Sequence, residues 1–120
     1  MEVFNKESSQ PHPNDFAANF VKGKMYYGLG IDKLAEATQV SPADKTGLYD
    51  KLQNECSNLF RQSIPYFNNA IRFIDKLDAE EQGANREKLS YCLNALNTVY
   101  IRLGMYDELK PIKVRIEELQ

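Results

Sequence analysis

The chain of 120 residues is long enough for one domain that buries about two-thirds of its unfolded surface. Apolar residues make up 42% and charged residues 27%, which is typical of globular proteins rather than of disordered ones. The 15 basic and 17 acidic residues give a net charge of −2, which provides no basic field for a phosphate backbone. We therefore expect a folded domain that does not bind nucleic acid.

Neither a membrane span nor a signal peptide is predicted, because no uncharged run approaches the roughly 20 apolar residues that a span needs. The residues that usually bind metals are also sparse. His12 is the only histidine, and Cys56 and Cys92 lie far apart in the sequence. Both cysteines fall in helical apolar stripes, so we expect buried thiols, with one disulfide as the alternative. The sequence contains no cofactor motif.

The first helix is expected to begin near Asp15. Pro11 and Pro13 separate it from a lead segment, residues 1–12, because proline lacks the N–H that a helix requires. Asn14 is a suitable N-cap for this helix. Apolar residues surround most of its circumference, which indicates contacts on several sides: Phe16, Phe20, Val21, Met25, Tyr26, Tyr27, Leu29, Ile31, Leu34 and Ala37.

A second helix is predicted from about Pro42, with Ser41 as its N-cap, although Gly47 could delay the start by a turn. Pro65 lies inside this helix, and we expect a kink rather than a stop because the apolar period continues past it. The helix should end by about Gln82. Its stripe has the steps of three and four that a helix requires: Leu48, Leu52, Cys56, Leu59, Ser63, Phe67, Ala70 and Ile74.

Two shorter helices complete the chain. Asn85 can cap the third, which should end at Gly104, a residue suited to the left-handed conformation of a helix stop. The fourth follows at once, with an apolar seam from Leu109 to Leu119. No strand pattern competes, so we predict an all-α fold of about four helices in two antiparallel hairpins.

The third helix contains Leu93-x-x-Leu96-Asn97-x-x-Tyr100. This pattern resembles the first helix of a tetratricopeptide repeat, W-x-x-L-G-x-x-Y, with Leu93 in place of the tryptophan and Asn97 in place of the glycine. If the resemblance holds, the third and fourth helices form one repeat.

The first and second helices carry a further copy of the motif. Gly23 and Tyr26 match the glycine and tyrosine of its first helix, and the second helix matches at Ser63, Phe67 and Ala70. Asn19 and Lys22 depart from the pattern, which weakens this copy. The resemblance implies a tetratricopeptide-like domain of two repeats over residues 13–120. Residues 1–12 would then occupy the place where a preceding repeat ends.

The resemblance also implies an elongated first hairpin, because Tyr26 and Ser63 are much farther apart than Tyr100 and Leu109. Divided equally, the excess corresponds to about four extra turns per helix. Such long hairpins resemble the last repeats of some bacterial tetratricopeptide proteins. Because these proteins occur in both the cytoplasm and the cell envelope, the compartment stays open.

In this family the concave groove is lined by the first helix of each repeat, which assigns a candidate groove to seven residues. The simpler alternative is that Phe20 and Tyr27 are core residues. A second alternative, an aromatic cage for a ligand, is less favoured than core packing. The candidate groove residues are Phe20, Lys24 and Tyr27 in the first hairpin and Tyr91, Asn94, Thr98 and Arg102 in the second.

We expect a non-enzymatic scaffold that binds a peptide or helix of a protein partner. The strongest catalytic candidates cluster at a helix end and are better explained as solvated charges: Asp75, Asp78, Glu80 and Glu81. The alternative function is structural, with the long hairpin packing on a second copy as a homo-oligomer. A small-ligand binder is the least favoured alternative.

Overall fold

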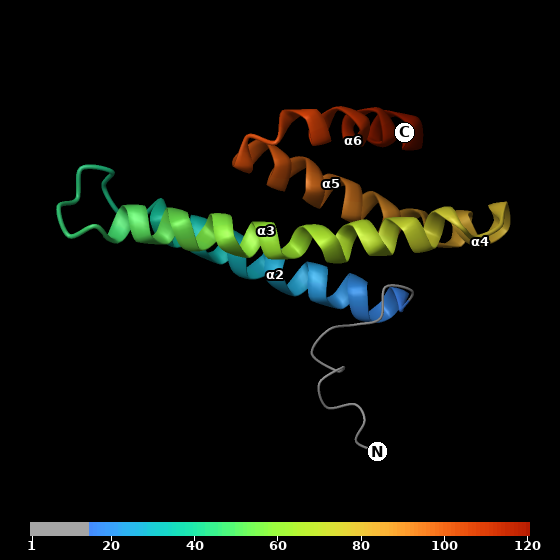
Figure 1. Ribbon diagram of the computed structural model, residues 1–120, viewed down its shortest axis with the longest axis horizontal. Helices are drawn as coiled ribbons and strands as arrows, with labels where there is room; N and C mark the ends of the chain where they lie inside the picture. Colours follow the sequence, from blue (N-terminus) through green and yellow to red (C-terminus); the bar gives the residue numbers. More distant parts are fainter. Residues whose placement is uncertain (1–14) are drawn as a thin grey trace, which may run out of the picture.

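The computed structural model describes residues 15–120. Helices α2 and α3 form a long antiparallel hairpin, α5 lies against it, and α6 stacks on α5 (Figure 1). No strand occurs in the described part of the chain, so the predicted all-α class with antiparallel hairpins is confirmed. The lead segment, residues 1–12, and Asn14 lie outside the described residues. The helices are α2 (Phe16–Ala37), α3 (Leu48–Asp75), α4 (Ala79–Ala84), α5 (Arg86–Leu103) and α6 (Tyr106–Leu119).

Helix α2 begins close to the predicted residue, and its N-cap is Asp15. The Oδ1 atom of Asp15 accepts a hydrogen bond from the backbone N–H of Ala18 at 3.0 Å. The carboxylate thereby satisfies one of the free N–H groups at the helix start.

Helix α3 begins at Leu48, later than predicted from Ser41 and Pro42. Ser41 instead starts a turn, in which its backbone oxygen accepts from the N–H of Asp44 at 2.9 Å. Gly47 precedes the helix with a φ of +82°, a left-handed conformation that a right-handed helix cannot include. The single glycine therefore delays the start of the helix.

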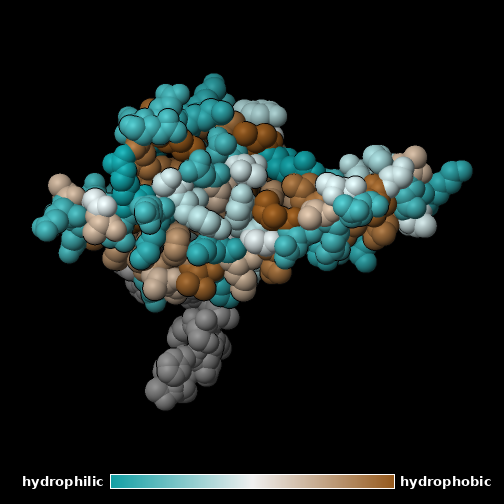
Figure 2. Space-filling model, turned by 180° about the vertical axis from the view of Figure 1, so that it is seen from behind, coloured by the Kyte–Doolittle hydropathy of each residue, from teal (hydrophilic) through white to brown (hydrophobic). Residues whose placement is uncertain are grey.

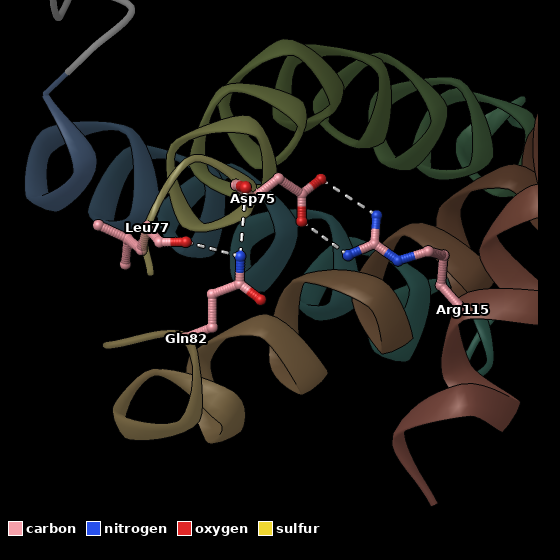
Figure 3. Close-up of polar contacts among 4 residues, drawn as sticks. All are labelled: Asp75, Leu77, Gln82 and Arg115. Carbon is pink, nitrogen blue, oxygen red and sulfur yellow. Dashed lines mark hydrogen bonds and ion pairs between the residues drawn. The ribbon is translucent and has the colours of Figure 1, made fainter. Parts of the chain in front are cut away.

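Helix α3 ends at Asp75, earlier than predicted, and a separate short helix, α4, follows. The Oδ1 atom of Asp78 accepts from the N–H of Glu81 at 2.9 Å and so starts α4. The side-chain nitrogen of Gln82 donates to the backbone oxygens of Leu77 at 2.9 Å and Asp75 at 3.2 Å (Figure 3). These bonds satisfy carbonyl groups at the end of α3 and just beyond it, so α3 ends directly after Ile74, the last residue of its apolar stripe.

Pro65 does not interrupt α3, as predicted. Two residues before it, the buried Ser63 donates a hydrogen bond from its hydroxyl to the backbone oxygen of Phe60 at 2.6 Å.

The two ends of α5 agree with the prediction in part. Gly104 ends α5 with a φ of +72°, but Asn85 does not cap α5 with its side chain, which donates instead to the oxygen of Glu81.

The first hairpin is the longer one, with helices of 22 and 28 residues against 18 and 14 in the second. We predicted that the extra residues would be divided equally between the two helices, and this is wrong. Most of them lie in α3 and in the connection 38–47, because α2 ends at Ala37 and α3 begins only after Gly47. The end of the hairpin that carries this connection projects beyond α5 and α6 (Figure 1).

The core lies between α3 and α5, and α2 packs along α3 with its aromatic side chains in contact with both α3 and α5. Side chains that are fully buried at its centre are Phe60, Phe67, Ile74, Leu93, Leu96 and Val99. Both cysteines are free thiols buried in this core, as predicted. No helix of the described chain is both long and apolar enough to cross a membrane.

Candidate binding groove

Helix α2 and helix α5 lie close enough for their aromatic side chains to meet. On α2, Phe20, Lys24 and Tyr27 are separated by four and three residues, so they lie on one side of the helix. The ring of Tyr91 on α5 lies 5.8 Å from Phe20 and 6.3 Å from Tyr27, in edge-to-face arrangements at 75° and 84°. Edge-to-face contacts are a favourable geometry for aromatic pairs.

Lys24 lies above this aromatic contact. Its Nζ atom is 5.1 Å from the centre of the Phe20 ring and 5.2 Å from that of Tyr91, within the range of a cation–π interaction. The ammonium group therefore bridges α2 and α5 and places a positive charge beside Tyr91.

The aromatic contact between α2 and α5 packs on two buried phenylalanines of α3. Tyr27 stacks on Phe60 at 5.5 Å and meets Phe67 at 6.1 Å, while Phe67 also lies 6.1 Å from Tyr91. Both phenylalanines are completely buried, so close packing restricts the positions that Tyr27 and Tyr91 can take.

A pocket of about 320 Å³ opens beside Tyr27 and Tyr91. Its other lining residues all lie on α5: Asn94, Ala95, Asn97 and Thr98. A second pocket of about 210 Å³ lies between α5 and α6, and it shares Asn94 and Asn97 with the first. The two pockets lie on the α2 side and the α6 side of α5 and share Asn94 and Asn97, and we call them together the α5 groove.

The polar side chains that line the α5 groove differ in whether they already have hydrogen-bond partners. The side-chain nitrogen of Asn94 donates to the backbone oxygen of Ser90 at 2.8 Å, and the Thr98 hydroxyl donates to the oxygen of Asn94 at 3.3 Å. The Oδ1 atom of Asn97, in contrast, is buried and has no hydrogen-bond partner among residues 15–120. A buried oxygen without a donor is costly, and because this atom is closed to solvent, the Asn97 side chain has to turn before a donor in the groove reaches it.

Burial raises the pKa of the Tyr91 phenol, and the neighbouring Tyr27 and Cys92 raise it further. The phenol therefore stays neutral at physiological pH and can both donate and accept a hydrogen bond. The groove thus combines aromatic rings and neutral polar groups with the charged side chains of Lys113 and Glu117 on the α6 side, while Lys24 lies beside Tyr91.

The structure brings together six of the seven predicted groove residues, in contacts or in the pocket lining: Phe20, Lys24, Tyr27, Tyr91, Asn94 and Thr98. Arg102 is not among them. Its guanidinium group donates instead to the side-chain oxygen of Gln53 on α3. Arg102 lies in the last turn of α5, where the longer α3 passes beside it. Gln53 of α3 therefore binds the Arg102 side chain, which is not part of the groove.

Asn97 is the groove residue whose role the sequence did not indicate. The motif comparison treated it only as a replacement for a small glycine, and nothing in the sequence marked its oxygen as unpartnered. Two of the carboxylates weighed as catalytic candidates have contacts of their own. Asp75 pairs with Arg115, Asp78 caps α4, and no group of three metal-binding side chains occurs within residues 15–120.

Comparison of the chain with protein-family models, curated protein sequences and solved structures finds no significant match. The candidate site is therefore defined by its own geometry.

Proposed function

We propose that this protein is a non-enzymatic interaction module that binds an extended peptide segment of a protein partner in the α5 groove. The observation that carries the proposal is the pocket beside the rings of Tyr27 and Tyr91, whose lining includes Asn97, a residue with a buried and unpartnered Oδ1 atom among residues 15–120. A backbone N–H of an extended peptide is a donor of the right kind for this oxygen.

The composition of the groove supports a peptide as the ligand. Tyr27 and Tyr91 present apolar rings with hydroxyl groups, a combination that suits protein interfaces because it buries large area at low entropic cost. Lys24 adds a positive charge beside Tyr91, which favours peptides with an acidic residue near that end.

The arrangement of the helices also supports a tetratricopeptide-like origin as part of the proposal. Gly23 faces α3 at a close contact, as the motif requires, and Leu93, Leu96 and Tyr100 of the second motif copy are buried. In such a pair of repeats the α5 groove corresponds to the surface that faces a ligand.

The test is selection of peptides from a random phage-displayed library, followed by affinity measurements on the selected peptides by fluorescence polarisation. We expect Tyr91→Ala and Asn97→Leu each to weaken binding by at least about tenfold, since each removes a contact at the centre of the groove. Lys24→Glu should weaken binding of acidic peptides most.

Tyr106→Ser is a matched control, because Tyr106 is an exposed tyrosine on α6 outside the pocket linings. Selected peptides should bind this variant as they bind the parent protein. Peptides that bind the groove variants as tightly as the parent would refute the proposal, as would repeated selection without enrichment.

A further inference from the structure

The outward side of α2 carries an apolar stripe that the described residues leave uncovered. Val21, Met25 and Leu29 follow one another at intervals of four residues, and they are 62%, 43% and 45% exposed. The helical period places Ala17 and Gly28 on the same side of α2. The surface in this stretch is therefore apolar or small over about three turns.

This stripe is distinct from the α5 groove. Phe20, Lys24 and Tyr27 point from α2 toward α5, where they contact Tyr91, whereas the stripe points away from that contact. In the space-filling view hydrophobic residues reach the surface in several patches among hydrophilic ones (Figure 2). An aligned apolar stripe on a helix is typical of an interface, in contrast to apolar residues that are scattered singly.

Charges beside the stripe differ between its two ends. Lys22 lies in the N-terminal half of α2, and Asp32 and Glu36 lie in the C-terminal half. Glu36 already pairs with Lys33 at 3.9 Å, whereas neither Lys22 nor Asp32 has a salt bridge within residues 15–120. The helix is thus basic at one end of the stripe and acidic at the other.

This distribution of charge is self-complementary only in one orientation. When two copies of α2 lie antiparallel, the basic half of each faces the acidic half of the other, and their helix dipoles are also opposed favourably. A parallel pair would place like charges side by side. An antiparallel pair centred on Met25 also brings Val21 of one copy opposite Leu29 of the second copy.

We propose that a second copy of this chain covers the stripe, with the two α2 helices packed antiparallel around Met25. Gly28 has no atoms within 4 Å of the place where a Cβ would lie, so a neighbouring helix can approach closely there. The contact is short compared with the roughly 1,600 Å² of a standard interface, which makes the dimer concentration-dependent rather than obligate.

Sedimentation equilibrium of the full chain from about 1 µM to about 1 mM tests the association. We expect a monomer–dimer equilibrium, and Met25→Glu should raise the dissociation constant at least about tenfold, because it places a charge in the apolar contact. Val114→Glu is the matched control. Val114 is 52% exposed on α6, so the same substitution there should leave the equilibrium unchanged.

Cross-linking tests the orientation. Val21→Cys and Leu29→Cys variants are mixed under mild oxidation, and an antiparallel pair should yield mainly the mixed disulfide between position 21 and position 29. The native Cys56 and Cys92 are fully buried and should not compete. The parent chain treated in the same way provides the background.

Charge reversal adds a third, independent measurement. Lys22→Glu should weaken the dimer, and adding Asp32→Lys to the same chain should restore it, because the pair then has the opposite but still complementary charges. The variants are all at exposed or half-buried positions, so circular dichroism should show the helical content of the parent.

A monomer at every concentration would overturn the proposal and assign the stripe to a different occupant. A dimer that Met25→Glu leaves unchanged, or disulfides formed mainly between identical positions, would overturn it as well. None of these results affects peptide binding in the α5 groove, which is tested through Tyr91 and Asn97.

Discussion

Gly23 of α2 lies directly against the ring of Phe67 of α3. A Cβ atom added to Gly23 would come within 2.8 Å of Cδ1 and 2.9 Å of Cε1 of Phe67, closer than real atoms approach. The ring is completely buried and contacts Tyr27 and Tyr91, so it has little room to move. Gly23 therefore sets the distance between α2 and α3.

Replacement of this glycine should separate the two helices. We expect Gly23→Leu to destabilise the fold by about 1 to 3 kcal/mol, because a large side chain in a close helix contact forces shifts in rotamers and backbone. Thermal unfolding followed by circular dichroism measures the effect. A variant that melts above the parent would show that this contact does not limit the packing.

Gly28 is the control on the same helix, since no atom lies within 4 Å of its potential Cβ. Gly28→Ala should be neutral or should stabilise the monomer by up to about 1 kcal/mol, because alanine has the higher helix propensity. The two substitutions thus have opposite expected signs. Measurements at low protein concentration keep the proposed dimer out of this comparison.

Asn97 should be a residue where stability and binding conflict. Asn97→Leu removes a buried oxygen that has no donor, so we expect the variant to be as stable as the parent or more stable by up to about 1 kcal/mol. The same variant should lose peptide binding in the α5 groove. Chemical denaturation measures the first effect, and a clear loss of stability would mean that Asn97 has a structural role instead.

Asp75 and Arg115 connect the ends of α3 and α6 through two hydrogen bonds, at 2.9 and 3.2 Å (Figure 3). Both side chains are partly exposed, so solvent screens their attraction. We expect Asp75→Asn to cost less than about 1 kcal/mol, with the difference disappearing at high salt. Urea denaturation at two salt concentrations checks this, and a larger or salt-independent loss would point to another role for Asp75.

The two thiols should be unreactive while the protein is folded. Burial raises the pKa of Cys92 from 9.0 to about 12, and burial also raises that of Cys56, although nearby Arg102 opposes the shift there. Since the thiolate is the reactive form, a thiol reagent at pH 8 should label both residues slowly in the native protein and rapidly after unfolding. Fast labelling of the native chain would contradict their burial.

The raised pKa of Cys92 also predicts a pH dependence of stability. Between about pH 9 and about pH 12 the unfolded chain loses the thiol proton while the folded chain keeps it. Deprotonation therefore stabilises the unfolded state relative to the folded state as the pH rises. The free energy of unfolding should therefore fall across this range. Cys92→Ala should show a smaller fall, and an equal slope in both proteins would exclude Cys92 as the cause.

Local sequence signals predicted the helices and several of their ends. The apolar period identified α2, α3, α5 and α6, and Gly104 stopped α5 where a left-handed residue was expected. These features depend on neighbours within one or two turns, and a single sequence contains that information. The signals competed at Gly47 and Asp78, where a glycine conformation and a side-chain cap prevailed over the start predicted from Ser41 and the end predicted near Gln82.

Tertiary structure decided how the helix faces are used. The sequence placed Phe20, Lys24, Tyr27, Tyr91, Asn94, Thr98 and Arg102 in one register, but only packing determined that Arg102 would bind Gln53 and that Asn97 would keep an oxygen without a donor. Packing likewise left Val21, Met25 and Leu29 exposed on a helix that is apolar nearly all round. The period of a helix fixes which residues share a face, whereas the positions of the other helices fix which faces are covered.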